Sequence, residues 1–393
     1  MIQYIFLLIN NVVLKIGSAI DAGFANSISL GVICVFAILD SIHNFLVAFY
    51  EYGAYYFRIY NCRAKAGLVF NVIVSIFCSV IFVVCADYFK FVYYIEPQYE
   101  QLLKNCVTVA FLYFPFESGT CYMRDVLVYS GKERYVSIVN VLFYCTLIPL
   151  DAAAVFMYHS VVLVLAGTGV SYFISFVLLY LNAPFRKDFF KTVDVIVILK
   201  DGLPVFYNRL LSEFCHLLVN IFGSKLGTVY YAMFSIIRMS LGSAQLCIHP
   251  VEPVIITKMR GCRDITYKKV FVSFKNIIAL GCVSYFVLGY IVMFVSRGDL
   301  VLSQIFFAVT IINAVSVGSY LFYVIGKSII SIQKKNDLIK NTATIRLCTT
   351  ILMCVVSYLF RDSVAGLACL ALYRFITDSI ASLYLFVRMR MCT

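Results

Sequence analysis

Apolar segments about 20 residues long recur along this chain, and each ends in a short polar turn. A helix of that length spans the hydrocarbon core of a bilayer, where every backbone polar group must find its hydrogen bond within the protein. The chain is 62% hydrophobic and only 13% charged, whereas an ordinary soluble domain is about 25% charged. A soluble fold of 393 residues could not bury so much apolar surface. We therefore predict an all-α integral membrane protein.

The apolar segments divide into twelve predicted transmembrane helices. They lie at residues 3–23, 27–50, 67–86, 102–129, 135–157, 160–181, 194–222, 228–250, 270–296, 300–326, 342–360 and 363–387. Lys and Arg are enriched in the cytoplasmic loops of membrane proteins. With a cytoplasmic N-terminus, the connections on that side and the span ends next to them hold 20 Lys and Arg residues, against 5 on the other side. This bias predicts a multi-pass protein of the plasma (inner) membrane with both termini in the cytoplasm.

The composition excludes several other classes of function. A net charge of +12 would suggest nucleic-acid binding in a soluble protein, but here the charge lies in short loops, so we expect no nucleic-acid partner. The 15 cysteines show no CxxC pair and mostly lie in apolar runs, which indicates small buried hydrophobes. The sequence contains no P-loop, GxSxG or HExxH motif. We therefore expect no enzyme and no cofactor, and we expect no cleaved signal peptide because the first span begins almost at Met1.

The chain also divides into two halves with equal numbers of spans. We predict an N-terminal six-helix lobe at 1–181, a cytoplasmic linker at 182–193 and a C-terminal six-helix lobe at 194–393. A Cys-Arg pair occurs in one cytoplasmic loop of each half, at Cys62-Arg63 and at Cys262-Arg263. Two bundles related by duplication, with the site between them, are a recurrent plan of secondary transporters. The alternative is that the two-residue match arose by chance.

Four stretches of the sequence carry a more specific pattern. They are INNVVLKIGSAIDAGFANSISLG at 9–31, SGKERYVSIVNVLFYCTLIPLDAAAVF at 130–156, VLAGTGVSYFISFVLLYL at 164–181 and ILKDGLPVFYNRL at 198–210. In this order and on a twelve-span plan, they resemble the multidrug and toxic compound extrusion (MATE) family, within the multidrug/oligosaccharidyl-lipid/polysaccharide exporter superfamily. The sequence departs from the family in lacking an early Pro in the first span, in having Asn26 where Gly is common, and in its short length. The resemblance implies a V-shaped transporter with two pseudo-symmetric lobes.

The resemblance also implies a cation-coupling site in the N-terminal lobe. Asp21 stands at the position of the family's coupling carboxylate, and Asn140 and Asp151 correspond to residues that line the cavity near it. Independently of the family, Asn140 and Asp151 are eleven residues apart, which places them on one helical face. A desolvated carboxylate can exchange a proton or bind Na⁺, so Asp21 is also the candidate Na⁺ ligand. The alternatives are an interfacial Asp21 that caps the second span and an Asp151 that makes a structural interhelical hydrogen bond.

Two further polar stripes are candidates for the cavity or for a proton relay. The second span carries Asp40, His43 and Asn44 on one face, and the seventh carries Glu213 and His216. Two ligand types on one helix are too few for a metal site, so we predict none there. The alternative for each stripe is a satisfied packing network. We expect three structural ion pairs: Arg209 with Glu213, Glu117 with Arg124, and Arg374 with Asp378.

Together these features predict a cation-coupled antiporter, driven by H⁺ or Na⁺, that exports organic cationic or amphiphilic molecules by alternating access. Its partners would be membrane lipid and a small-molecule substrate, and we expect a monomer. The alternative is a flippase of the same superfamily that moves lipid-linked oligosaccharides. A flippase needs a cationic cavity for pyrophosphate, and Lys15, Arg209, Arg238 and Lys275 leave that alternative open.

Overall fold

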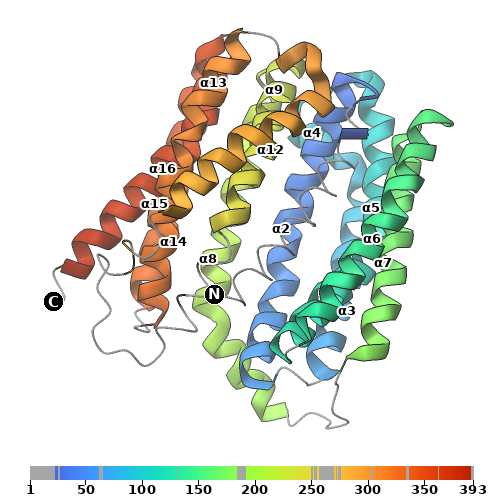
Figure 1. Ribbon diagram of the computed structural model, residues 1–393, viewed down its shortest axis with the longest axis vertical. Coiled ribbons are helices and arrows are strands. Elements are labelled where there is room, and N and C mark those ends of the chain that lie inside the picture. The colour runs from blue at the N-terminus through green and yellow to red at the C-terminus, as the bar shows by residue number, and fades with distance from the viewer. Residues whose placement is uncertain are drawn as a thin grey trace. The chain divides into compact units, whose positions relative to one another are not determined.

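The computed structural model describes residues 23–24, 27–61, 65–130, 132–183, 192–248, 276–301, 304–332, 336–361 and 363–390, together with 251, 255, 270 and 272. Every regular element in these residues is a helix (Figure 1). The helices are α2 (Leu30–Asn61), α3 (Lys65–Val84), η1 (Ala86–Tyr88), α4 (Phe89–Val92), α5 (Pro97–Tyr129), α6 (Glu133–Phe156), α7 (Val161–Asn182), α8 (Thr192–Ser224), α9 (Thr228–Ile248), α12 (Asn276–Val301), α13 (Gln304–Ala314), α14 (Ser316–Ile332), α15 (Asn336–Leu359) and α16 (Val364–Arg390).

The helices follow the predicted spans closely. Among the described residues, every predicted span from 27–50 to 363–387 is helical over most of its length, and the first span, 3–23, lies almost entirely outside the described residues. The span predicted at 300–326 is the exception, because a turn at Val315 divides it between α13 and α14. Near this turn the hydroxyl of Tyr285 on α12 donates to the carbonyl of Thr310 at 3.1 Å. A membrane helix can tolerate a break when a side chain from another helix donates a hydrogen bond to a backbone carbonyl near the break.

Helix α3 shows how the chain meets its surroundings. Its exposed positions among the described side chains are all apolar, and they recur every three or four residues along one side of the helix: Val69, Ile73, Ile76, Phe77, Val80, Ile81 and Val84. Its buried face instead carries Asn71, Ser75 and Ser79. A soluble helix has the opposite pattern, with apolar residues inside. The reversal indicates that lipid covers the outer face, and seven described helices are long and apolar enough to cross a membrane. The protein is therefore a multi-pass membrane protein.

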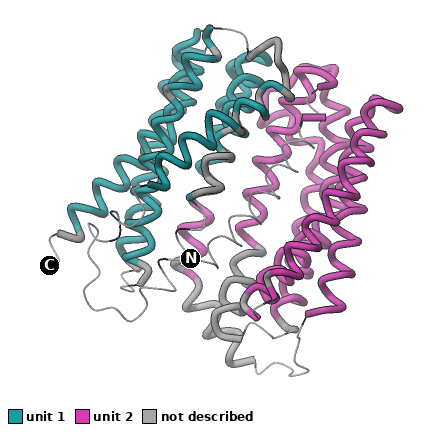
Figure 2. Tube along the Cα trace, in the orientation of Figure 1, with its two compact units in different colours: residues 1–19, 214–393 teal, residues 20–213 magenta. Residues whose placement is uncertain are grey.

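The chain forms two compact units (Figure 2). In unit 2, whose described residues run from Gly23 to Glu213, helix α5 packs against α2, α3 and α7, and α6 packs against α7. The core of unit 2 lies around the last turns of α5, at Tyr122, Met123, Val126 and Leu127. In unit 1, whose described residues begin at Phe214, α12 packs against α9, and α16 packs against α14 and α15. The predicted lobe boundary at 182–193 stays a prediction, because residues 184–191 lie outside the described part.

The first turn of α16 depends on a glycine. A Cβ atom on Gly366 would lie 2.6 Å from the carbonyl oxygen of Phe360 and 3.0 Å from that of Ser357. These are backbone atoms, which cannot rotate away as a side chain can. The carbonyl of Gly366 also accepts a hydrogen bond from the Ser357 hydroxyl at 2.9 Å. The α15–α16 turn is therefore closed at a point where only glycine fits.

We predict that Gly366→Ala lowers the free energy of unfolding by about 1–3 kcal/mol, the usual cost of overpacking. The matched control is Gly318→Ala in α14, because a Cβ there meets nothing within 4 Å and alanine is the better helix former by up to about 1 kcal/mol. Thermal unfolding in detergent, followed with a thiol-reactive fluorophore that reports the exposure of buried cysteines such as Cys106, compares the two. Equal melting temperatures for both variants would contradict the steric argument.

Candidate functional site

A buried carboxylate at the centre of unit 2 joins three helices. Glu117 lies midway along α5 and is 6% exposed. Its Oε2 lies 2.8 Å from Nε2 of His43 on α2, and its Oε1 accepts a hydrogen bond of 3.1 Å from the hydroxyl of Tyr172 on α7. Both carboxylate oxygens therefore have a partner from a different helix. We call Glu117, His43 and Tyr172 the unit 2 cluster.

Aromatic packing fixes the position of Tyr172 in this cluster. Its ring stacks on Tyr113 of α5, with centroids 5.8 Å apart, and meets Phe143 of α6 at 4.9 Å. The close approach of α7 to α5 depends on Gly169, where a Cβ would lie 3.1 Å from the Cβ of Tyr113. The phenol is thus held from two sides and its hydroxyl reaches the carboxylate. Sequence reasoning missed Tyr172 because one tyrosine among 29 carries no signal of its own.

The predicted polar stripe on α2 leads from the exposed surface of unit 2 to the cluster. Asp40 is exposed, and Asn44 donates to its carboxylate at 2.9 Å. The His43 side chain is 28% exposed and the Glu117 side chain 8%. Glu213 of α8 is close enough to His43 to act on it electrostatically, and it pairs with Arg209 at 3.3 Å as predicted. The structure therefore brings four of the residues singled out on α2 and α8 into one neighbourhood.

The predicted ion pair of Glu117 with Arg124 is wrong. Seven residues are two helical turns, a rise of about 10 Å, and the two carboxylate oxygens of Glu117 already contact His43 and Tyr172. The guanidinium of Arg124 lies instead over the ring of Phe143, 5.9 Å from its centroid. The sequence placed both residues on one face of α5 but could not show that α2 and α7 supply the partners.

Asn140 and Asp151 are both fully buried in α6. Gly167 of α7 makes room for the carboxylate, because a Cβ at this glycine would lie 3.3 Å from Oδ1 of Asp151. The expected proximity of Asp151 to Asp21 stays a prediction, because Asp21 and the rest of the first span lie outside the described residues. A role for Asn140 and Asp151 in cation coupling stays a prediction as well.

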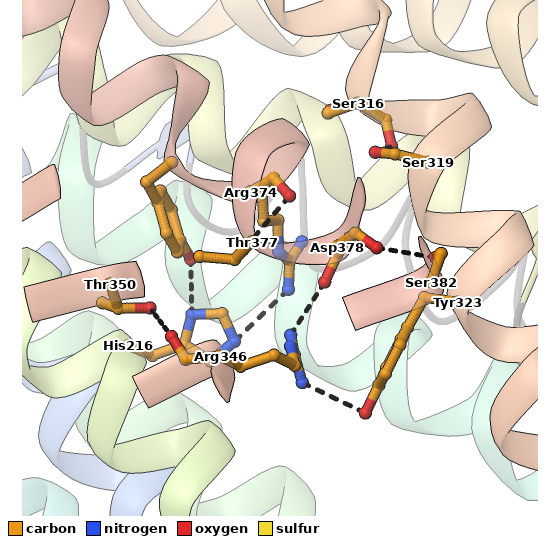
Figure 3. A network of polar contacts seen from close by, with 11 residues as sticks. His216, Ser316, Ser319, Tyr323, Arg346, Thr350, Arg374, Thr377, Asp378 and Ser382 are labelled. Carbon is orange, nitrogen blue, oxygen red and sulfur yellow. Dashed lines mark hydrogen bonds and ion pairs between the residues drawn. The ribbon is translucent and has the colours of Figure 1, made fainter. Parts of the chain in front are cut away.

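Unit 1 contains a second buried polar network (Figure 3). Arg346 of α15 pairs with Asp378 of α16 at 3.1 Å, and its guanidinium lies 4.5 Å from the ring centroid of Tyr323 on α14. His216 of α8 contacts the Tyr373 hydroxyl at 2.8 Å through Nδ1 and Nη2 of Arg374 at 3.3 Å through Nε2. Four helices of unit 1 thus meet through charged or polar side chains.

The predicted ion pair of Arg374 with Asp378 is also wrong. Asp378, which is fully buried, forms its ion pair with Arg346, and Arg374 reaches His216 instead. A guanidinium can only donate hydrogen bonds. Nε2 of His216 therefore accepts from Arg374, and Nδ1 carries the ring hydrogen and donates to the Tyr373 oxygen. His216 lies in this unit 1 network and Glu213 in unit 2, so the predicted stripe on α8 serves two separate sites.

Among the residues that the structure describes, no three His, Cys, Asp or Glu side chains gather in an arrangement able to hold a metal ion. Both clusters consist of hydrogen-bond donors and ion pairs around single carboxylates. Such arrangements can bind or release protons and can hold helices together.

Comparison with known proteins identifies the fold. No family model matches the sequence, and no curated protein matches it. Among solved structures, the chain matches the inward-facing conformation of a multidrug resistance MATE family transporter of the MOP superfamily, with a TM-score of 0.68 and 13% identity over 99% of this chain and 94% of that one. The outward-facing conformation of such a transporter matches with a TM-score of 0.65 and 15% identity over the same shares. The chain has the MATE fold.

A further match is a MOP superfamily transporter from Pyrococcus furiosus Vc1 (DSM3638), with a TM-score of 0.69 and 14% identity over 99% of this chain and 94% of that chain. Its reported binding pocket has reversed polarity, which is said to suggest a different function for that protein. These matches confirm at the level of fold the resemblance seen in the sequence, and with it the predicted all-α, twelve-helix architecture. Similarity of fold does not by itself assign a substrate to the chain.

We predict that breaking the Arg346–Asp378 pair from one side is strongly destabilising. Arg346→Met leaves a buried carboxylate without its guanidinium partner, which costs about 3–5 kcal/mol in comparable buried pairs. The double variant Arg346→Met/Asp378→Leu should recover much of that loss. The same cycle on Lys104 and Asp87, an exposed pair at 2.9 Å, should give a coupling of at most about 1 kcal/mol. Unfolding in mixed detergent–SDS micelles measures both cycles, and equal coupling energies would contradict the prediction.

Proposed function

We propose that the chain is a secondary transporter that exports organic cationic or amphiphilic molecules in exchange for H⁺ or Na⁺. The observation that supports it best is the burial of three unit 2 carboxylates, Glu117, Asp151 and Glu213, within the spans of a chain that has this fold. Ionisable side chains at membrane depth are costly, so they normally mark an ion or substrate pathway. The multidrug resistance transporters that the chain resembles in fold add support by analogy.

Buried carboxylates give a physical basis for exchange. A coupling cation and a cationic substrate each neutralise the same negative charge, so the binding of one lowers the affinity for the other. We propose that Asp21, Asp151 and Asn140 form the coupling site and that Asp40, His43, Asn44 and Glu213 line the pathway or relay protons. We assign His216 of unit 1 a supporting role. A membrane potential of 100 mV contributes about 2.3 kcal/mol for each charge moved.

The orientation proposed for the transporter follows from its loops. The connections assigned to the cytoplasm, with the span ends next to them, hold twenty Lys and Arg residues against five on the other side, which favours cytoplasmic termini in the plasma membrane. Substrate would then enter from the cytoplasm and leave on the other side when the coupling cation binds. A monomer with membrane lipid around it and no cofactor is sufficient for this cycle.

A second candidate function is favoured by the network in unit 1. The guanidiniums of Arg346 and Arg374 both lie near one carboxylate, Asp378, so this network carries more basic than acidic groups. A transporter with such a site would suit an anionic cargo, as in the flipping of lipid-linked oligosaccharides. The reversed pocket polarity reported for the Pyrococcus furiosus protein shows that one fold can present either charge. We rank this function second, because the buried carboxylates of unit 2 favour cations.

Efflux of ethidium from proteoliposomes tests the proposal. A proton gradient and a sodium gradient are imposed separately on wild type, Asp21→Asn and Asp151→Asn. We expect gradient-driven efflux in wild type and a loss of about tenfold or more in both variants, since tenfold corresponds to only about 1.4 kcal/mol. Asp87→Asn, which changes an exposed carboxylate on η1, is the matched control and should leave efflux unchanged.

Each other result has a defined meaning. Efflux that survives both substitutions would retain the exporter but reject Asp21 and Asp151 as the coupling site. Wild-type vesicles that show no efflux under either gradient would contradict an exporter of organic cations. Translocation of a lipid-linked sugar by the same vesicles would then support the flippase.

A further inference from the structure

We propose that Glu117, His43 and Tyr172 form a proton-binding site, with Glu117 as the group that is protonated and deprotonated during transport. The existence of the site is independent of the substrate, but its use in transport rests on the function proposed above. The site differs from the coupling residues predicted by resemblance, because it lies on α2, α5 and α7 and includes neither Asp21 nor Asp151. Under this proposal the unit 2 cluster binds a proton and not a sodium ion.

The geometry around Glu117 favours a proton over a metal cation. Hard cations such as Na⁺, Mg²⁺ and Ca²⁺ are held by several oxygen atoms that act as electron donors. The Glu117 oxygens instead meet a ring nitrogen and a phenol O–H group. Tyr172 donates its hydrogen to the carboxylate, so a cation placed there would face that hydrogen. A proton needs no further ligands and fits on Oε2 between Glu117 and His43.

A route for the proton leads from the exposed side of α2. Asp40 is exposed, the His43 side chain is 28% exposed and that of Glu117 is 8% exposed. Imidazole has two nitrogens, so it can accept a proton on one and release a proton from the other. A proton that binds Nδ1 of His43 makes an imidazolium. Nε2 then passes its hydrogen to Oε2 of Glu117, which leaves a neutral imidazole and a neutral carboxylic acid, with one proton gained overall.

Charged and titratable groups from α2, α5, α6 and α8 lie near this site. Glu213 of α8 and Asp40 of α2 lie near His43 and favour a cationic ring during transfer. Cys121 and Arg124 of α5 and Tyr144 of α6 lie near Tyr172. Groups of both charges therefore lie near His43 and Tyr172, the two side chains that contact Glu117.

Protonation of Glu117 would change its contacts with two other helices, α2 and α7. Hydrogen bonds to a carboxylate are roughly twice as strong as those to a neutral group. Glu117 binds α2 through His43 and α7 through Tyr172, so neutralising it weakens both attachments to α5 at once. A proton-coupled transporter needs such a change. Proton binding can drive transport only if it alters how the helices pack. A purely structural cluster would keep Glu117 charged throughout.

Infrared difference spectroscopy on the purified protein in lipid tests the site without any substrate. A pH step between acid and neutral buffer should produce a band in the region of protonated carboxylic acids that is absent in Glu117→Gln. Tyr172→Phe keeps the ring packing but removes the donor to Oε1, so the band should remain and shift in frequency. Glu100→Gln is the matched control, since Glu100 lies on the same helix, is exposed and pairs with Lys90 at 3.2 Å. A spectrum of Glu117→Gln identical to wild type would overturn the proposal.

Transport assays separate this inference from the proposed function. Glu117→Gln should lose proton-driven accumulation of ethidium, whereas the control Glu100→Gln should keep it. A variant that lacks the infrared band yet accumulates ethidium as well as wild type would overturn the coupling role. Wild-type vesicles that transport no ethidium under any gradient would count against the proposed function, whereas the infrared band would still decide whether Glu117 binds a proton.

Discussion

The structure depends on one constraint, which is that the outside of each span must be apolar while its polar groups find partners among other helices. Helix α3 shows this directly, since Phe77 and its apolar neighbours face outward while Asn71, Ser75 and Ser79 are buried. Asn71 and Ser118 exchange hydrogen bonds between α3 and α5 through their side chains and backbone carbonyls, at 3.3 and 3.4 Å. Polar contacts between membrane helices replace the hydrophobic effect, which is weak when lipid is as apolar as the core. They therefore decide which helices pack together.

The same constraint explains why the charged residues lie in groups. A single charge at membrane depth is costly, and a partner from another helix reduces the cost while fixing the packing of both. Glu117 links three helices in unit 2 through its two oxygens. In unit 1, Arg346 links α14, α15 and α16 through Tyr323 and Asp378. Each unit is therefore organised around buried polar groups, and the surrounding apolar packing accommodates them.

Hydropathy and loop charge were sufficient to predict nearly all the described helices, because the bilayer imposes a length and a polarity that a sequence must display. The spacing of four residues between Arg209 and Glu213 also predicted their ion pair, because one helical turn brings the two side chains into contact. The partners of Glu117 and Asp378 could not be predicted, because they come from helices whose packing no local pattern specifies. The turn at Val315 was missed for a related reason. The nearby carbonyl of Thr310 accepts a hydrogen bond from Tyr285 of another helix. The sequence around the turn is as apolar as that of an unbroken span.

The two networks place a histidine in opposite electrostatic settings. His216 accepts a hydrogen bond from Arg374, so a proton on that nitrogen would remove the acceptor and bring two positive charges together. The ring is therefore held in one neutral tautomer, which suits a fixed support for α16. His43 faces Glu117, with Asp40 and Glu213 nearby, so a proton on its ring is accompanied by carboxylates on several sides. The same side chain thus suits a structural role in one unit and the proton transfer that we propose in the other, because its partner is a guanidinium in the first case and a carboxylate in the second.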